Sequence, residues 1–96
     1  MITEIAFIEV ISENHTAFEV AVRKAVAEIL PQAKGYVDFE LQKGIEQPNT
    51  YCFHIRWETL EDHTIGFRES ELFVQWRSII GGYFAKPPIV EHWASV

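Results

Sequence analysis

Cysteine, basic side chains and long apolar runs are scarce in this sequence, and each scarcity excludes a class of protein. One cysteine, Cys52, cannot form an internal disulfide, which is typical of the reducing cytoplasm. Eight Lys and Arg stand against fourteen Asp and Glu, a formal net charge of −6 that argues against nucleic acid or an anionic membrane as partner. No apolar run approaches the roughly 20 residues that span a bilayer, and the opening MITEIAFIEV lacks the basic region of a signal peptide. We therefore expect a cytoplasmic protein that binds neither nucleic acid nor membrane.

The rest of the composition is that of an ordinary globular protein. Hydrophobic residues make up 48% of the chain and charged residues 23%. A chain of 96 residues is long enough for one hydrophobic core and too short for two. No repeat, low-complexity tract or linker interrupts it, so we expect a single domain over residues 1–96.

The spacing of apolar residues predicts secondary-structure elements in the order β-α-β-β-α-α-β. Alternating apolar positions indicate strands, and positions that recur at i, i+3, i+4 and i+7 indicate helices. The predicted strands cover residues 2–11, 37–42, 51–58 and 89–94, and the predicted helices cover residues 18–30, a short stretch from 60, and residues 71–83. Ser12 or Asn14, then Thr59, then Ser70 have the side chains that cap helix N-termini.

This order fits a ferredoxin-like α+β fold, the split β-α-β sandwich. In that fold a four-stranded antiparallel sheet carries its helices on one face. The first strand has apolar residues on both alternating sets, Ala6 and Ile8 against Ile5 and Phe7, so we expect both of its faces to be covered. The economical cover for the second face is another copy of the chain, which predicts a homodimer that closes sheet against sheet.

Three segments resemble the antibiotic biosynthesis monooxygenase superfamily. They are the strand that ends in Trp57-Glu58, the segment GFRES..F..WR from Gly66 to Arg77, and the closing PPIVEHW from Pro87 to Trp93. The resemblance covers nearly the whole chain and implies a dimeric α+β barrel with a pocket between sheet and helices. It further implies a monooxygenase that oxidises a planar phenolic, quinol or polyketide-like small molecule with O₂, without flavin, heme or metal. The alternative is a non-catalytic dimeric small-molecule-binding or stress-related protein of the same fold.

Two better-known branches of that superfamily differ from this chain at their functional positions. The heme-degrading branch resembles it in length, but its strand asparagine and its helical tryptophan and histidine correspond to Val10, Phe67 and Arg77. The quinol-oxidising branch resembles it at Trp57-Glu58, but its histidines correspond to Gly66 and Glu71. The resemblance therefore implies that the protein does not use heme, and it does not identify which histidines are catalytic.

His63 is the main candidate for a catalytic base. Leu60, His63 and Phe67 share a helical face, so we expect the imidazole to point toward the sheet. Its ordinary pKa near 6.5 suits removal of a proton from a phenol or enol, the step that must precede oxidation of the substrate anion by O₂. The structural alternative is a core histidine held by a backbone or carboxylate partner.

His54 and His92 are the substitute candidates for this role. His54 shares a strand face with Arg56, opposite Phe53 and Ile55, and either face can line the pocket. His92 lies in the last predicted strand, where it is either a base or a hydrogen-bonding residue of the strand or dimer interface. The four histidines, at positions 15, 54, 63 and 92, do not have the short spacing of a metal-ligand motif, and the single cysteine adds none, so the sequence does not indicate a metal site.

The other candidates bind substrate rather than transfer protons. Arg68 lies at the joint between two predicted helices, where it can hold an anionic oxygen of a ligand or pair with a neighbouring carboxylate. We expect Arg77 to form a structural ion pair. Four aromatic residues are candidates for the pocket wall, where a planar ligand could stack on them: Trp57, Phe67, Trp76 and Tyr83. The structural alternative is that they fill the hydrophobic core.

Overall fold

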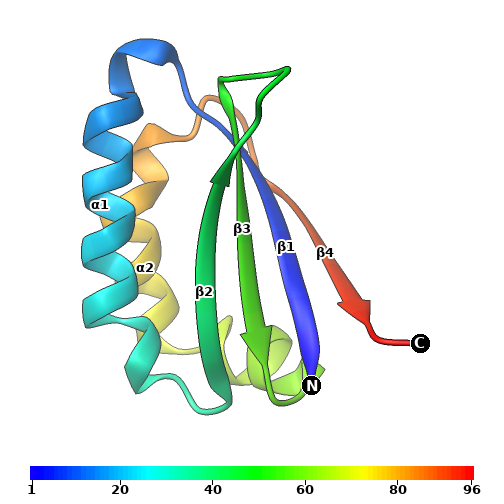
Figure 1. Cartoon of the computed structure of the whole chain (residues 1–96). Coiled ribbons are helices and arrows are strands. Elements are labelled where there is room, and N and C mark those ends of the chain that lie inside the picture. The colour runs from blue at the N-terminus through cyan, green and yellow to red at the C-terminus, as the bar shows by residue number, and fades with distance from the viewer.

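The protein is described by a computed structural model that covers residues 1–96 (Figure 1). Its strands are β1 (Ile2–Glu9), β2 (Tyr36–Lys43), β3 (Thr50–Trp57) and β4 (Ile89–Ala94), and its α-helices are α1 (His15–Glu28) and α2 (Glu71–Ile80). The middle predicted helix is a π-helical segment, Asp62–Phe67. The predicted element order is therefore confirmed. Neither α-helix is long and apolar enough to cross a bilayer.

The four strands form one antiparallel sheet in the order β2-β3-β1-β4. Both α-helices lie side by side on one face, and the opposite face carries no helix (Figure 1). The predicted ferredoxin-like α+β fold is thus confirmed. The central strand β1 pairs with β3 and with β4, and this register places Glu4 beside Ile55 on one side and His92 on the other.

The two faces of β1 differ in their surroundings. Ala6, Ile8 and Val10 are at most 3% exposed because they point into the layer between sheet and helices. Phe7 points to the other face and is 39% exposed. Within one chain the second face of the strand is therefore uncovered. The prediction that both faces are covered could hold only if a second molecule lies against this face.

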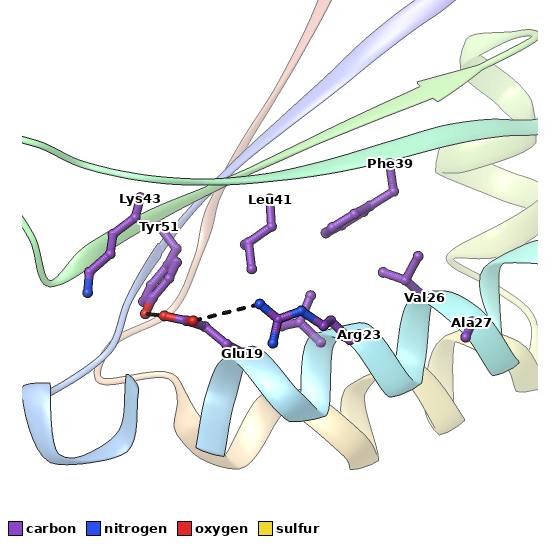
Figure 2. Close-up of a pocket in the computed structure, with 9 residues that line it drawn as sticks. Glu19, Arg23, Val26, Ala27, Phe39, Leu41, Lys43 and Tyr51 are labelled. Carbon is purple, nitrogen blue, oxygen red and sulfur yellow. Dashed lines mark hydrogen bonds and ion pairs between the residues drawn. The ribbon is translucent and has the colours of Figure 1, made fainter. Parts of the chain in front are cut away.

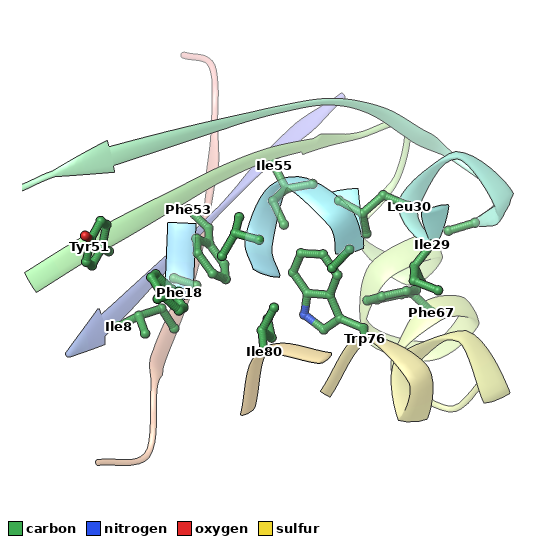
Figure 3. Close-up of a cluster of buried hydrophobic side chains, with 14 of the residues drawn as sticks. Ile8, Phe18, Ile29, Leu30, Tyr51, Phe53, Ile55, Phe67, Trp76 and Ile80 are labelled. Atoms are coloured by element: carbon green, nitrogen blue, oxygen red, sulfur yellow. The ribbon is translucent and has the colours of Figure 1, made fainter. Parts of the chain in front are cut away.

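The core is a continuous layer of aromatic and aliphatic side chains between the sheet and the two helices (Figure 3). Phe18 of α1 is fully buried and contacts two rings of β3, with centroids 4.8 Å from Tyr51 and 6.1 Å from Phe53. Trp76 of α2 lies 5.9 Å from Phe53 in an edge-on arrangement. Strand β3 thus holds both helices through its inward-facing aromatic residues.

The predicted helix caps are only partly confirmed. Thr59 Oγ1 accepts a hydrogen bond from the Asp62 N–H at 3.1 Å, as expected. Helix α1 begins directly after Asn14, but neither Asn14 nor Ser12 bonds to its backbone. Ser70 occupies the cap position of α2, and its hydroxyl donates instead to the carbonyl of Phe67 at 2.6 Å. That bond closes the π-helical segment rather than capping the helix that follows.

Candidate active site

The site is centred on Glu4, a carboxylate of the central strand that lies inside the protein. Only 6% of Glu4 is exposed, and its side chain shares the inward face of β1 with Ala6 and Ile8. Trp57, at the end of the adjacent strand β3, donates its indole N–H to Glu4 Oε1 at 3.0 Å. A buried carboxylate requires such partners because burial removes its hydration.

His63 and His92 extend this contact into a row of three polar side chains. His63 Nε2 lies 3.2 Å from Glu4 Oε1, and His63 Nδ1 lies 2.8 Å from His92 Nε2. His63 is 2% exposed, and its ring stacks on Trp57 with a centroid distance of 5.3 Å and an interplanar angle of 23°. The three side chains come from β1, the π-helical segment and β4, and we call them the Glu4–His63–His92 chain. π-Helical turns are frequent at functional sites.

Burial is the main influence on the pKa values of Glu4, His63 and His92. It raises the pKa of Glu4 to about 7, although the Trp57 hydrogen bond and the positive charge of Arg68 act to lower it. Burial, with the charges of Arg68 and His92, lowers the pKa of His63 to about 3. Burial and Arg68 also lower the pKa of His92. At pH 7 His63 is therefore neutral, and Glu4 is divided between carboxylate and carboxylic acid.

A cavity of about 180 Å³ opens beside Glu4, between the sheet and α2. Seven of its 12 lining residues are hydrophobic, among them Phe73 and Phe84. Its polar lining consists of Glu4, His63, Arg68 and Arg77. Glu4 Oε2 accepts no hydrogen bond from the protein, and no buried side-chain nitrogen or oxygen lacks a partner. This oxygen therefore faces open space, where a bound molecule can reach it.

Arg68 is the cation whose charge acts on the Glu4 carboxylate. It lines the cavity, its charge acts on Glu4, His63 and His92, and it forms no ion pair within the chain. Arg77 forms no ion pair either, so the expected structural pair is wrong. Its guanidinium lies 5.1 Å from the ring centroid of Phe84, a cation–π contact.

The structure brings some of the predicted site residues together and separates others. His63, His92 and Arg68 gather around Glu4, and Trp76 lines the cavity. His54 lies on the helix-free face of the sheet, because β3 turns Tyr51, Phe53, Ile55 and Trp57 toward the helices. The face of this strand that sequence reasoning left open is thereby identified.

The remaining aromatic candidates lie outside the cavity lining. Trp57 and Phe67 are buried behind His63, with ring centroids 5.4 Å apart. Tyr83 packs edge-on against Phe18 at 6.1 Å. Leu60, expected on the inward face with His63, is 39% exposed because it precedes the π-helical segment that turns His63 and Phe67 inward.

Sequence reasoning missed Glu4, Phe73 and Phe84 at the site. A signal for Glu4 exists: it is the one charged residue on the alternating set that also contains Ala6 and Ile8. A charged residue on an otherwise apolar strand face is buried with partners or functional. Phe73 and Phe84 carry no such signal, since any aromatic residue at helical spacing reads as core.

A second and more open cavity of about 530 Å³ lies between α1 and the edge strand β2 (Figure 2). At one end Tyr51 donates its hydroxyl to Glu19 at 2.5 Å, and Arg23 lies 3.9 Å from the same carboxylate. Burial and the Glu19 hydrogen bond raise the pKa of Tyr51. The one carboxylate here, Glu19, is already held by Tyr51 and Arg23, and no imidazole lines the cavity, so the smaller cavity at Glu4 is the candidate active site.

The fold and the site define a class: a small ferredoxin-like α+β protein with a buried carboxylate–imidazole chain beside an apolar cavity. The sequence profile of the antibiotic biosynthesis monooxygenase family matches residues 1–78. A crystal structure of a proposed antibiotic biosynthesis monooxygenase from Bordetella bronchiseptica superposes with a TM-score of 0.94, at 37% identity over 99% of this chain and 96% of that one. The chain belongs to the antibiotic biosynthesis monooxygenase family, as the sequence motifs predicted.

Other relatives agree with this placement. The uncharacterized protein YczJ of Bacillus subtilis is 36% identical over 96 residues, which is 100% of both chains. A proposed monooxygenase of the same kind from Nitrosomonas europaea superposes with a TM-score of 0.81 over 99% of this chain and 89% of that one. Its 17% identity supports the shared fold alone.

Proposed function

We propose that this protein is a cofactor-independent monooxygenase that oxidises a small phenolic, quinol or polyketide-like compound with O₂. Membership of the family supports a general monooxygenase role. The observation that carries the narrower proposal is the free Oε2 of Glu4, a buried carboxylate that faces an apolar cavity beside Arg68. Such a cavity receives an apolar ring, and the carboxylate receives its acidic proton.

The sequence led us to expect His63 as the catalytic base, but Glu4 suits this role better. Both nitrogens of His63 already face partners, Glu4 on one side and His92 on the other. A pKa near 7 keeps a large fraction of Glu4 ionised at neutral pH and still makes it a stronger base than an ordinary carboxylate. Arg68 is placed to stabilise the anion that forms when the substrate loses its proton.

The proposed reaction balances without another reductant. Glu4 Oε2 takes the acidic proton of the substrate, from a phenolic O–H or an activated CH₂ group, and the resulting anion gives one electron to O₂. The two radicals combine at a carbon that carries hydrogen, and a C–O bond forms as a peroxide. Loss of the C–H proton from that carbon with cleavage of the O–O bond leaves a carbonyl, and the second oxygen atom departs as water. The substrate thus loses two hydrogens and gains one oxygen atom, and O₂ supplies both that atom and the oxygen of H₂O, with Glu4 first taking and then returning protons.

The size of the cavity favours small substrates within this class. A cavity of about 150 Å³ accommodates benzene, and drug-sized ligands occupy roughly 300 Å³ or more. The 180 Å³ beside Glu4 therefore fits one aromatic ring with short substituents better than a fused three-ring polyketide.

An oxygen electrode tests the proposal with one-ring hydroquinones, naphthohydroquinones and anthrones as probes. We expect O₂ to be consumed faster than in buffer alone, and fastest with the one-ring compounds. When the oxidant is ¹⁸O₂, the product should contain one ¹⁸O atom. If no probe is consumed faster than in buffer but one raises the melting temperature, the chain is a non-catalytic small-molecule-binding protein. If no probe does either, the proposed substrate class is wrong.

We also propose that the helix-free face of the sheet pairs with a second copy of the chain. That face leaves Phe7 39%, Ile89 56% and Trp93 57% exposed, which is unusual for large apolar side chains of a monomer. Sedimentation equilibrium should give twice the 11.1 kDa chain mass, and Phe7→Glu should shift the protein toward monomer because it places a charge in the interface. Val20→Glu, at a helix position 60% exposed, is the matched control. A wild-type monomer at micromolar concentration would contradict pairing.

A further inference from the structure

We propose that the Glu4–His63–His92 chain is a proton relay that connects the Glu4 carboxyl with solvent, and that His92 is its solvent end. The relay deepens the proposed function, because it sets the protonation of the base between turnovers. Its existence can nevertheless be tested on the protein without any substrate.

The backbone fixes the geometry of the relay. Glu4 and His92 are direct partners in the antiparallel pairing of β1 with β4, so the sheet itself holds both side chains on the same face. His63 reaches in from the π-helical segment, and its two nitrogens lie 3.2 Å from Glu4 Oε1 and 2.8 Å from His92 Nε2. A single imidazole thus bridges the carboxyl and the second ring with both of its nitrogens in hydrogen-bonding range.

The two ends of the relay, Glu4 and His92, are open in different directions. Glu4 Oε2 has no protein partner and faces the cavity. His92 Nδ1 also has no protein partner, and no side-chain nitrogen or oxygen of the protein is both buried and unpaired. His92 Nδ1 therefore reaches solvent, whereas His63, at 2% exposure, does not.

Two arrangements of the protons satisfy every hydrogen bond. When Glu4 is ionised, His63 Nε2–H donates to Glu4 Oε1, and His92 Nε2–H donates to His63 Nδ1. When Glu4 is a carboxylic acid protonated on Oε1, it donates to His63 Nε2, and His63 Nδ1–H donates to His92 Nε2. Both rings then carry their proton on Nδ1 rather than Nε2, and both are neutral in either arrangement.

One proton converts the first arrangement into the second. Water gives a proton to His92 Nδ1, the His92 Nε2 proton moves to His63 Nδ1, and the His63 Nε2 proton moves to Glu4 Oε1. The reverse sequence returns one proton to solvent, once rotation of the carboxyl group has brought a proton accepted on the cavity side into the position next to His63 Nε2. Glu4 can therefore equilibrate with bulk water while a bound ring fills the cavity and blocks the direct route to Oε2.

The charged groups around the relay favour neutral rings. Arg68 and Arg77 line the same cavity, and Trp57 contributes an uncharged N–H from β3. The positive charge of Arg68 opposes a charged imidazole at both His63 and His92. Proton transfer through two neutral rings avoids a buried cation.

The first test is ¹⁵N NMR of the imidazole nitrogens in the substrate-free protein across pH. We expect His63 and His92 to change from the Nε2–H to the Nδ1–H tautomer together as pH falls through about 7, where Glu4 gains its proton. In Glu4→Gln, which cannot ionise, the joint change should be absent. Rings that keep one tautomer through this range, or that change at separate midpoints, would overturn the relay.

The second test separates a relay from a merely positioning His92. His92→Gln retains an amide that can bond to His63 but cannot transfer a proton, and His92→Phe retains neither property. A relay predicts that both variants lower kcat about 100-fold, the lower end of what proton transfer contributes, and that added imidazole partly restores both. Normal kcat in His92→Gln would overturn the relay. Joint tautomer change without any turnover would leave the relay standing and count against the proposed function.

Discussion

Glu4→Gln is expected to lower kcat/KM for an oxidised probe by about 10²–10⁴-fold, the usual contribution of a positioned base. The amide oxygen of glutamine can still accept the Trp57 N–H, so the fold keeps that hydrogen bond, but the side chain can no longer take a proton. In the wild type, kcat/KM should rise with pH through about 7, because Glu4 is active only after it has lost its proton. This rise should disappear in the variant.

Glu9→Gln is the matched control for that experiment. Glu9 lies on the same strand, but its carboxylate is near the surface, 3.2 Å from Lys86 Nζ, and faces no cavity. Its replacement should leave kcat/KM within a factor of about two. Steady-state O₂ consumption at several pH values measures both variants, and a Glu4→Gln enzyme with wild-type kcat/KM would remove Glu4 from the mechanism.

Phe18→Ala should produce the largest loss of stability, about 3–5 kcal/mol in the free energy of unfolding. Phe18 is fully buried and lies between Tyr51, Phe53 and Tyr83, so its removal leaves a cavity where α1 meets the sheet. For a domain of this size each kcal/mol corresponds to about 4–8 °C, so the melting temperature should fall by at least about 12 °C.

Val20→Ala on the same helix is the control, since Val20 is 60% exposed. Its effect should stay within about 0.5 kcal/mol. Urea unfolding followed by circular dichroism gives both free energies. Equal losses in the two variants would mean that the contact of α1 with β3 is not the main packing interface of the fold.

The fold was accessible from the sequence because its elements are amphipathic with clear periods. The alternation of Tyr51, Phe53 and Ile55 identified β3, and the resemblance supplied the topology. Alternation alone does not say which alternating set faces inward, so His54 remained a candidate until β3 was seen to turn it toward the helix-free face.

The site was less accessible, for two physical reasons. His63 and Phe67 were correctly placed inward, but a π-helical turn, which no helical spacing predicts, shifts Leu60 away from them. The contact of His63 with Glu4 and His92 depends on strand register between the two ends of the sequence. No local pattern reports that register, so the partners of the buried histidine could not be named in advance.

The edge position of β4 gives the site an unusual dependence on local opening. β4 pairs with one neighbour only, and edge elements detach from a folded protein at a lower free energy than central strands. Detachment of β4 removes His92 while Glu4, Trp57 and the packed interior stay in place. If His92 is the solvent end of the relay, as proposed, turnover at Glu4 requires the last strand to be docked, and amide exchange along β4 measures the fraction of molecules in which it is not.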